Sequence, residues 1–311
     1  MPKPIVILGV FVADVTFRAD RMPKMGETLL GNSFALGPGG KGSNQAVATA
    51  MAGAEVHMLT RLGDDTFGDM ALDIWGKAGV RSAATRRSDH PTGAAFIYVD
   101  EESGDNAIII SPGVAGTIAP SDLEAKAELI RSAGIFITQL EQPIDAALRG
   151  FEIARDAGVT TILNPAPAAT LPDGMLALTD IVTPNESEAE ALTGIAVESV
   201  ADAERASAKF LDAGVKWSII TLGQNGVFLT DGRIKAHVPA RAAGPVVETT
   251  GAGDAFNGGF AAALSEGASP IEAARFGCAT AGISVTRPGT APSMPARSEI
   301  EAFLKTFPTD P

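Results

Sequence analysis

The sequence predicts an α/β fold with a mainly parallel sheet that has helices on both faces. Short segments rich in Ile and Val alternate with longer segments of helical periodicity, the pattern of a parallel sheet. Several helical segments end at a glycine, as helix C-termini do. The chain has 311 residues, of which 45% are hydrophobic and 20% are charged. This composition predicts a large core and excludes a disordered or coiled-coil protein.

Six segments have the length and composition of buried strands. In chain order they are residues 5–8, 55–59, 135–138, 160–163, 181–183 and 218–222. Helices are expected between them over residues 43–52, 67–78, 121–131, 144–157 and 199–213. The last third of the chain is predicted to be nearly all helical, over residues 252–265, 270–285 and 296–307.

Two further segments break this alternation. Residues 28–35 and 93–110 are predicted strands without the helices of the main pattern, and the second contains a polar turn at residues 100–104. They predict a small β-sheet beside the main sheet. We therefore expect one domain over residues 1–311, with a lid formed from about residues 14–40 and 92–110.

The composition also limits the partners. A net charge of −13 argues against a nucleic-acid or anionic-membrane surface. Cys278 is the single cysteine, which excludes an intramolecular disulfide and a cysteine-based zinc cage and favours a reducing compartment. No apolar stretch approaches the roughly 20 residues that a membrane span needs. We therefore expect a cytoplasmic protein that binds neither nucleic acid nor membrane.

A glycine-rich turn within residues 248–260 leads into an apolar helix and is the most informative motif. The N–H groups of Gly251, Ala252 and Gly253 would lie at the helix N-terminus, where unpaired donors and the helix dipole favour an anion such as a phosphoryl group. Asp254 would lie in the first turn beside that anion. The alternative is that Asp254 only caps the helix and the glycines only allow tight packing.

A second glycine-rich loop covers residues 37–45. Gly37, Gly39 and Gly42 formally match the G-x-G-x-x-G pattern of dinucleotide sites. The match is weak, because a predicted lid strand precedes it in place of the first strand of the main sheet. Lys41 and Asn44 at the start of a helix suit hydrogen bonds to a polyhydroxylated ligand, and a lid hinge without ligand contacts is the alternative.

A third cluster, which contains Asn185 and Glu188, follows the predicted strand at residues 181–183. Asn185 can cap a helix, and the carboxylates after it favour the helix dipole, so structure alone explains the cluster. The functional alternative is that Glu188 holds a hydrated Mg²⁺ near a nucleotide, because Mg²⁺ prefers one or two carboxylates together with waters and phosphates.

Taken together, these segments resemble the ribokinase family of carbohydrate kinases over essentially the whole chain. The matching segments follow the family's order and are residues 39–46, 140–143, 164–167 with 183–188, and 249–258. The resemblance implies a ribokinase-like three-layer α/β/α fold with a small β-sheet lid. It also implies ATP-dependent phosphorylation of the primary 5-hydroxyl of D-ribose, the use of Mg²⁺ and K⁺, and a homodimer formed through the lids.

The resemblance further implies a role for each matching residue. Asp254 is the general base, and Gly251, Ala252 and Gly253 form the anion hole. The implied sugar-binding residues are Val12, Asp14, Gly40, Lys41, Asn44 and Glu141, with Asp254. Those near ATP are Asn185, Thr221, Gly223, Gly226, Gly253 and Cys278, with Glu188 near Mg²⁺. The implied monovalent-cation positions are Glu248, Thr250, Ser284, Arg287, Gly289 and Ser293.

Three positions qualify these expectations. The family's ribokinases usually carry Asn where this chain has Val12, and an apolar side chain cannot hydrogen-bond a ribose hydroxyl. We therefore expect weaker discrimination against 2-deoxyribose, or a preference for it, with another small furanose as a further alternative. Glu248 stands where the pattern has Asp, which predicts a weaker or indirect cation contact. Cys278 is favoured as a small buried apolar thiol.

The motifs also allow two other classes of protein. An NAD-linked dehydrogenase would depend on the formal glycine match at Gly37, Gly39 and Gly42. A non-catalytic sugar-binding protein would keep the polar residues of the loop that contains Lys41, but it would not need the turn at residues 251–254. The intact turn favours the kinase. Thr221 and the residues up to Gly226 otherwise form an ordinary connection between two strands.

Overall fold

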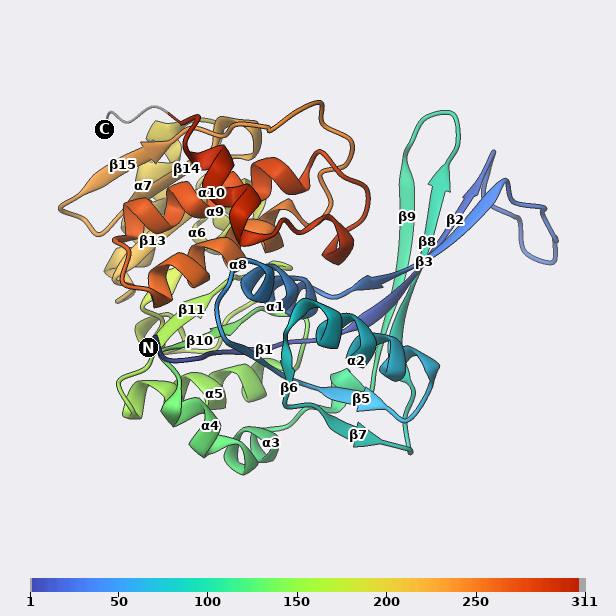
Figure 1. Cartoon of the computed structure of the whole chain (residues 1–311), viewed down its shortest axis with the longest axis horizontal. Helices are drawn as coiled ribbons and strands as arrows, with labels where there is room; N and C mark the ends of the chain where they lie inside the picture. The colour runs from blue at the N-terminus through green and yellow to red at the C-terminus, as the bar shows by residue number, and fades with distance from the viewer. Residues whose placement is uncertain (1, 308–311) are drawn as a thin grey trace.

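Nine strands form the central sheet of the computed structural model, which describes residues 2–307 (Figure 1). Their spatial order is β15 (Lys235–Val238), β14 (Val227–Thr230), β13 (Trp217–Thr221), β12 (Ile181–Val182), β11 (Thr160–Leu163), β10 (Ile135–Thr138), β1 (Ile5–Leu8), β4 (Val56–Leu59) and β6 (Arg81–Ser82). All neighbours are parallel except the pairs β13–β14 and β14–β15.

Strand β1 shows why the sheet is covered on both faces. Its side chains alternate, so Ile5 and Ile7 enter one core while Val6 and Leu8 enter the other. The first core is closed by α1 (Lys41–Met51), α2 (Thr66–Ala78), α8 (Ala252–Ser265), α9 (Pro270–Ser284) and α10 (Arg297–Leu304). The second is closed by α3 (Pro120–Ala125), α4 (Ala127–Ser132), α5 (Ile144–Asp156), α6 (Glu186–Thr193) and α7 (Val200–Asp212). We call the sheet and these helices the body.

The six predicted strands of the body are all present, but not every boundary matches. The helix predicted over residues 121–131 is interrupted at Lys126, whose backbone leaves the helical region, so α3 and α4 are separate. The antiparallel hairpin of β14 and β15 is not among the predicted strands, although the alternative of a connection between two strands at Thr221 to Gly226 anticipates β14. Its second strand is short and partly exposed, and therefore lacks the apolar signal of the buried strands. None of the helices within residues 2–307 is both long and apolar enough to cross a bilayer.

A second sheet, the lid, has the strand order β3 (Ser33–Gly39), β2 (Val12–Ala19), β8 (Thr92–Asp100) and β9 (Asn106–Gly113). The expectation of a strand over residues 28–35 is wrong for its first part, because Gly31 and Asn32 close the loop between β2 and β3. The Asn32 N–H donates to Arg18 O at 2.7 Å, and its side chain donates to Asp20. A separate pair, β5 (Arg61–Gly63) and β7 (Thr85–Arg87), lies beside the body.

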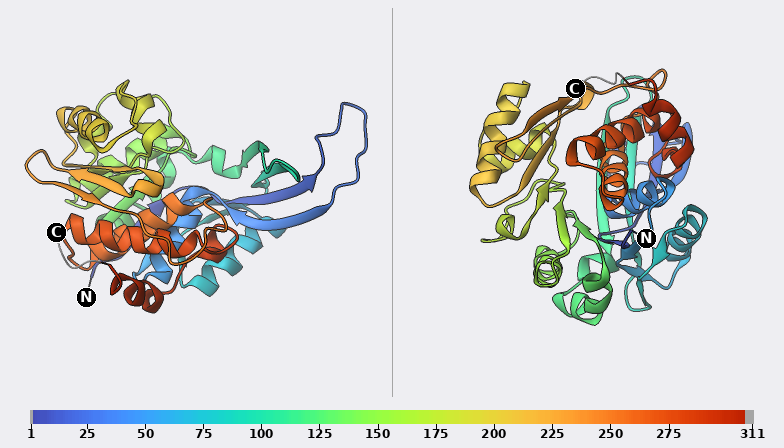
Figure 2. Two further views of the ribbon diagram at one scale, coloured as in Figure 1. Left: turned by 90° about the horizontal axis from the view of Figure 1, so that it is seen from above. Right: turned by 60° about the vertical axis from the view of Figure 1, so that its left-hand side comes forward.

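The lid projects from the body in two views of the molecule (Figures 1 and 2). Phe17 pairs with Phe34 across β2 and β3, and Phe96 pairs with Ile109 across β8 and β9. The rings of Phe17 and Phe96 are 6.0 Å apart, so both pairs share one face. Asp14 is three residues from Phe17 on β2 and therefore points to the opposite face. We call the face with Phe17, Phe34, Leu36 and Ile109 the outer lid face.

Polar residues follow the carboxyl ends of neighbouring strands. Glu141 comes after β10, Asn164 directly after β11, and Asn185 after β12. The sheet order reverses around β1, which lies between β10 and β4. In open α/β sheets this is where ligands bind. The candidate site therefore lies at this edge, below the base of the lid.

Candidate active site

Asp254 lies buried in the first turn of α8 and is held by two amides from α1. Asn44 Nδ2 donates to its Oδ2 at 3.0 Å, and Gln45 Nε2 donates to its Oδ1 at 3.1 Å. Burial raises the pKa of Asp254, while the Lys41 charge and these two hydrogen bonds lower it. Asn44 Oδ1 is buried and has no partner within the described residues, so an acceptor remains for a bound hydroxyl.

Gly40 and Lys41 form the start of α1. Gly40 has a φ of 88°, and a Cβ there would come 2.5 Å from Val10 O, so the position requires glycine. The Lys41 N–H donates to Glu141 Oε2 at 2.8 Å. This hydrogen bond connects the start of α1 to the segment after β10, which places two predicted sugar-binding residues side by side.

Val12 and Asp14 both lie on β2, two residues apart and therefore on one face of the lid. Val12 is buried and packs against Gly93 of β8, where an added Cβ would meet its Cγ1 at 2.9 Å. The carboxylate of Asp14 lies over Gly39 of β3, where a Cβ would come within 2.3 Å of it. Both residues are therefore presented by the base of the lid.

Four carboxyl groups of the site are difficult to ionise, because burial raises the pKa of each. The pKa of Glu141 is raised to about 7 and that of Asp14 to about 6. The pKa values of Glu188 and Asp254 are also raised by burial. The charge of Lys41 opposes this effect at Glu141, Glu188 and Asp254. Lys41 is therefore a cation that favours ionisation of these three carboxyl groups against the effect of burial.

The glycine-rich turn precedes α8 as predicted, with Gly251 at the N-cap and a φ of 80°. The N–H of Ala252 donates to Thr249 O at 3.1 Å and is therefore already engaged in the turn. Gly251 packs against Thr290, whose Oγ1 donates to Pro38 O of the lid strand β3 at 2.8 Å. Gly253 is exposed at the start of α8, beside Asp254.

The predicted nucleotide residues are brought together by a contact between two strand ends. Asn185 and Thr221 form a parallel bridge, and the Thr221 N–H donates to Pro184 O at 2.9 Å. Asn185 caps α6, and Glu188 Oε2 accepts from the Asn185 N–H at 2.9 Å, so the structural interpretation of this cluster is realised. Gly226 has a φ of 91°, and a Cβ there would lie 2.0 Å from Val238 O.

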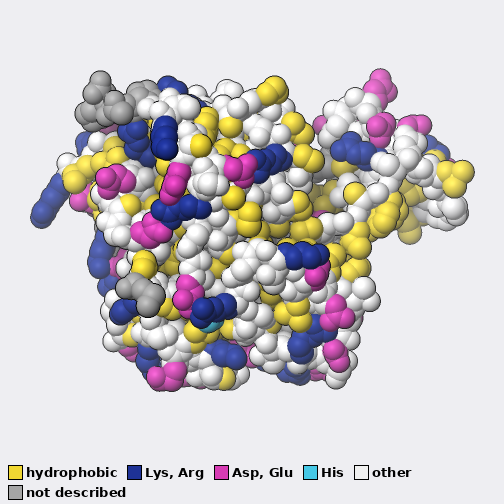
Figure 3. All heavy atoms as spheres, viewed as in Figure 1, with side chains coloured by type: hydrophobic (Ala, Val, Ile, Leu, Met, Phe, Trp, Pro, Cys, Tyr) yellow, Lys and Arg dark blue, Asp and Glu magenta, His cyan; other side chains and the backbone are white. Residues whose placement is uncertain are grey.

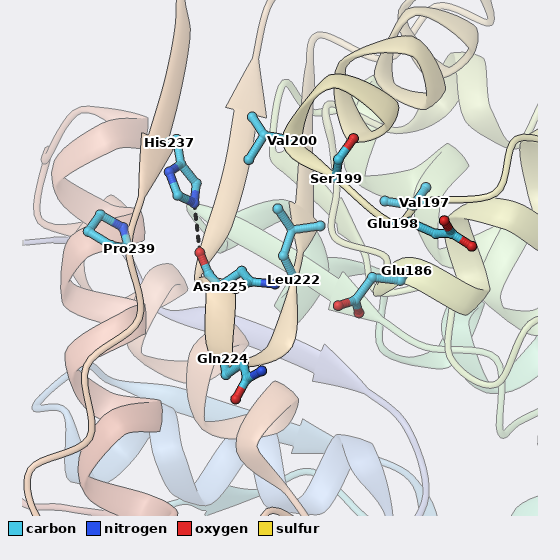
Figure 4. Close-up of a pocket in the computed structure, with 10 residues that line it drawn as sticks. All are labelled: Glu186, Val197, Glu198, Ser199, Val200, Leu222, Gln224, Asn225, His237 and Pro239. Carbon is cyan, nitrogen blue, oxygen red and sulfur yellow. Dashed lines mark hydrogen bonds between the residues drawn. The ribbon is translucent and has the colours of Figure 1, made fainter.

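A surface pocket of about 410 Å³ adjoins the connection between β13 and β14 (Figure 4). Leu222, Gln224 and Asn225 line it from the connection between β13 and β14, and Asn225 O lies 2.7 Å from His237 Nε2. The other lining residues are Glu186, Val197, Glu198, Ser199, Val200 and Pro239. The sequence predicted the neighbouring Thr221, Gly223 and Gly226 as nucleotide-binding residues. It did not predict the residues that line this pocket, because they come from separate elements of the chain.

Cys278 lies on α9 and packs in the core, and burial raises the pKa of its thiol to about 12. This agrees with the interpretation as a small apolar side chain. Its predicted contact with ATP stays a prediction.

The predicted cation positions lie in the loop before α8, at the last residue of α9 and in the segment after α9. Glu248 connects the loop to that segment, because its Oε2 accepts from the Gly289 N–H at 2.8 Å. Ser284 and Ser293 are buried and donate to the carbonyls of Ala281 and Thr290. Arg287 pairs with Glu299 on α10. Thr250 is exposed. Within residues 2–307 no cluster of three or more His, Cys, Asp or Glu side chains could hold a metal.

The residues around Asp254 can take a proton from a hydroxyl group that attacks a phosphoryl group. The buried carboxylate can accept a proton, Lys41 supplies positive charge, and the start of α8 faces the same region. Gly37 and Gly39, by contrast, belong to the antiparallel lid strand β3, which is not the first strand of a dinucleotide-binding unit. The geometry therefore gives no support to the dehydrogenase.

Known proteins resemble this chain over its full length. The chain is 38% identical over 306 residues to a ribokinase of Haemophilus influenzae, with 98% of this chain and 99% of that protein covered. It is 33% identical over 302 residues to a deoxyribokinase of Salmonella typhi, with 96% and 98% covered. The solved structure of Arabidopsis thaliana ribokinase complexed with ribose and ATP has a TM-score of 0.92 and 34% identity, and covers 99% of this chain and 100% of that one.

The model of the pfkB family carbohydrate kinases matches residues 3–297. This match and the similar proteins confirm the resemblance, the ribokinase-like α/β fold and the phosphotransferase class. The chain belongs to the pfkB family of carbohydrate kinases.

Proposed function

We propose that this protein transfers the γ-phosphoryl group of ATP to the primary 5-hydroxyl of D-ribose. The observation that carries the proposal is the buried Asp254 carboxylate, held by Asn44 and Gln45 at the N-terminus of α8. The similarity to ribokinases supports ribose as the acceptor and ATP as the donor.

In the proposed reaction Asp254 accepts the proton of the sugar hydroxyl as that oxygen attacks the phosphorus of ATP in line. Asp14, Lys41, Asn44 and Glu141 bind the other hydroxyls, with the backbone at Gly40. The N–H groups at the start of α8 stabilise the charge that develops on the transferred group, and Gly253 is an exposed residue of this turn. ADP leaves from the side of Asn185, Thr221, Gly223 and Gly226.

Glu188 fits a water-mediated contact with Mg²⁺. Its capping of α6 uses Oε2, and the carboxylate has a second oxygen. Mg²⁺ commonly uses one or two carboxylates and completes its shell with waters and phosphates. When bound, the ion would neutralise charge on the phosphates of ATP.

The loop before α8 and the segment after α9, which carry the predicted cation positions, fit an activity that depends only weakly on K⁺. Glu248 already connects them through the Gly289 N–H, so the side chain orders the loop that the family orders with a cation. We expect turnover rates that differ by less than about twofold among buffers with K⁺, Na⁺ or a bulky organic cation. Initial rates of ADP release at constant ionic strength measure this, and a rate that collapses without K⁺ would contradict it.

Val12 favours 2-deoxyribose as the competing substrate. A buried Val12 beside Asp14 leaves one ribose hydroxyl without a partner, which costs about 1–3 kcal/mol, or about 5- to 150-fold in relative kcat/KM. The Salmonella typhi deoxyribokinase is a relative of similar length. We expect Val12→Asn to raise the ratio of ribose to deoxyribose turnover within this range. An unchanged ratio would remove Val12 as the discriminating residue.

The outer lid face supports a homodimer formed through the lids. Its side chains Phe34, Leu36 and Ile109 have exposed fractions of 59%, 46% and 67%. Hydrophobic side chains also lie along the lid in the space-filling view (Figure 3). A second copy of this sheet would cover the face.

A cytoplasmic location, favoured by the single Cys278, stays a prediction.

The deciding experiment measures ADP release from ATP and Mg²⁺ with ribose, 2-deoxyribose, fructose and adenosine. Ribose turnover that exceeds the other three supports the proposal. Preference for 2-deoxyribose supports the alternative kinase, and no turnover with any acceptor would refute both.

A further inference from the structure

Gln45 is a fully buried residue of α1 that the predicted chemistry does not use. Its Nε2 donates to Asp254 Oδ1 at 3.1 Å and to Asn164 Oδ1 at 3.0 Å. Its Oε1 accepts from Gln139 Nε2 at 2.6 Å. The side-chain amide thus uses both N–H groups and its oxygen within the protein, and it has no N–H left for a ligand.

These contacts belong to a ring of mostly buried hydrogen bonds, which the peptide bond between Gly253 and Asp254 closes. Asn164 Nδ2 donates to Thr183 O at 2.9 Å, and Thr183 Oγ1 donates to Asn257 Oδ1 at 2.7 Å. Asn257 Nδ2 donates to Gly253 O at 2.9 Å, next to Asp254 in the chain. The ring joins α1, the ends of β11 and β12, and α8, so the Asp254 carboxylate is held relative to all four elements.

The two oxygens of Asp254 differ in what holds them. Oδ1 accepts from Gln45, whose amide is committed to the ring. Oδ2 accepts from Asn44, a predicted sugar-binding residue whose own Oδ1 lacks a partner within the described residues. The side of the carboxylate toward Oδ2 and Asn44 is therefore the side that is adapted to a ligand.

We propose that Gln45 is a positioning residue that holds Oδ1 of Asp254 and leaves Oδ2 to accept the proton of the attacking hydroxyl. The inference depends on the proposed role of Asp254 as general base. It adds a residue outside the predicted site and assigns the two carboxylate oxygens different tasks.

A donated hydrogen bond stabilises the carboxylate relative to the carboxylic acid, so Gln45 opposes the effect of burial on Asp254. Three charged groups interact electrostatically with Asp254. They are Lys41 on α1, Glu141 after β10 and Glu188 on α6. Asp14 on β2 acts on Glu141. Only Lys41 among these charges favours ionised Asp254, so loss of the Gln45 donor should raise the pKa.

The test is a ¹³C carboxyl NMR titration of Asp254 in the full chain, with the resonance assigned from Asp254→Asn. Gln45→Met keeps the length of the side chain and removes the donor, and we expect it to raise the Asp254 pKa by about one unit. The acid limb of the kcat profile should move by the same amount. The KM values for sugar and ATP should change by less than about twofold, because Gln45 is committed within the protein.

Ser43→Ala is the matched control. Ser43 is a buried residue of the same helix, and its Oγ accepts from Trp75 Nε1 at 2.9 Å, away from Asp254. The control should lose stability but keep the Asp254 titration of the unmodified protein. A titration in Gln45→Met that agrees with this control within about 0.2 unit overturns the inference.

Gln45→Glu decides the question if the Met variant does not fold. An ionised carboxylate at this position cannot donate and repels Asp254, so the titration should move further upward, and an unchanged titration overturns the inference. The NMR titration needs no turnover. If the titration shifts but the protein phosphorylates no sugar, the proposed function is refuted. The hydrogen bond from Gln45 to Asp254 and its effect on the Asp254 pKa are then still supported.

Discussion

The body and the lid differ in how their apolar faces are covered. In the body, β1 buries Ile5 and Ile7 in one core and Val6 and Leu8 in the other. In the lid, the outer face carries phenylalanine, leucine and isoleucine side chains that none of the described residues 2–307 covers. The apolar faces of the body are therefore covered by its own chain, whereas the lid leaves an apolar face exposed.

The same difference applies to polar groups. Asp254 in the body is surrounded by a closed ring of hydrogen bonds from the chain itself. Asp14 in the lid reaches the site only because β2 extends from the body, and its contact there is the backbone of β3. Chemistry within the body should thus be independent of protein concentration, whereas functions of the lid should depend on it.

The largest expected effect is that of Asp254→Asn, which removes the proposed general base. We expect kcat to fall by about 10²- to 10⁴-fold at every protein concentration. Initial rates of ADP release over a wide range of dilution measure this. Glu272→Gln is the matched control, because it changes a carboxylate to an amide in the first turn of the neighbouring helix α9. A variant with more than a tenth of the original rate would contradict the assignment of the base.

A smaller effect is expected from Ile109→Asp on the outer lid face. Loss of about 1.5–3 kcal/mol of apolar burial, together with an added charge, should weaken dimerisation by about 100-fold. Light scattering at micromolar concentration should show a dimer for the unmodified protein and a monomer for the variant.

Ile234→Asp is the control for this prediction, because Ile234 is an exposed isoleucine of the body with an exposed fraction of 49%. It should leave the mass unchanged. A monomeric unmodified protein would show that the difference between body and lid does not lead to self-association.

The smallest expected effect concerns Glu141, at the junction of body and lid. Its pKa is about 7 in the folded state, against an ordinary value of 4.5. The folded state therefore binds more protons between these values, and the free energy of unfolding decreases as the pH rises through this interval. Glu141→Gln should remove this decrease. Between pH 5 and pH 8 the free energy of unfolding of the variant should therefore rise by about 1–3 kcal/mol relative to that of the unmodified protein.

Urea unfolding of both proteins at the two pH values measures the difference. Glu128→Gln removes an exposed carboxylate of α4 and should leave the pH dependence as it is. A constant difference in stability between Glu141→Gln and the unmodified protein would show that Glu141 ionises in the folded site as it does in the unfolded chain.

Much of the body could be predicted because its signals are local. The strands at Ile135–Thr138 and Thr160–Leu163 and the helix at Ala252–Ser265 have the predicted bounds, since apolar periodicity and glycine punctuation act within a few residues. The lid strand β3 was placed too early, because its start depends on where Asn32 meets Arg18 across the sheet.

The candidate site was predicted only in part. The motifs identified Asp254, Asn44 and Lys41, but Gln45 follows Asn44 directly and was not singled out. Its position in the glycine-rich loop of residues 37–45 was the one sequence signal that could have identified it as a site residue. What distinguishes it is contact with Asp254, Asn164 and Gln139, which are 94 to 209 residues away in the chain.

The sequence by itself determined the alternation of strands and helices, the glycine-rich turns and the family, because these depend on residue type and short spacing. Only the tertiary structure decided which amides hold each oxygen of Asp254 and which lid face stays uncovered. Asn44 and Asp254 are 210 residues apart, and their hydrogen bond exists because α1 and α8 pack on the same face of the sheet. Such contacts depend on packing across the fold, which no local pattern specifies.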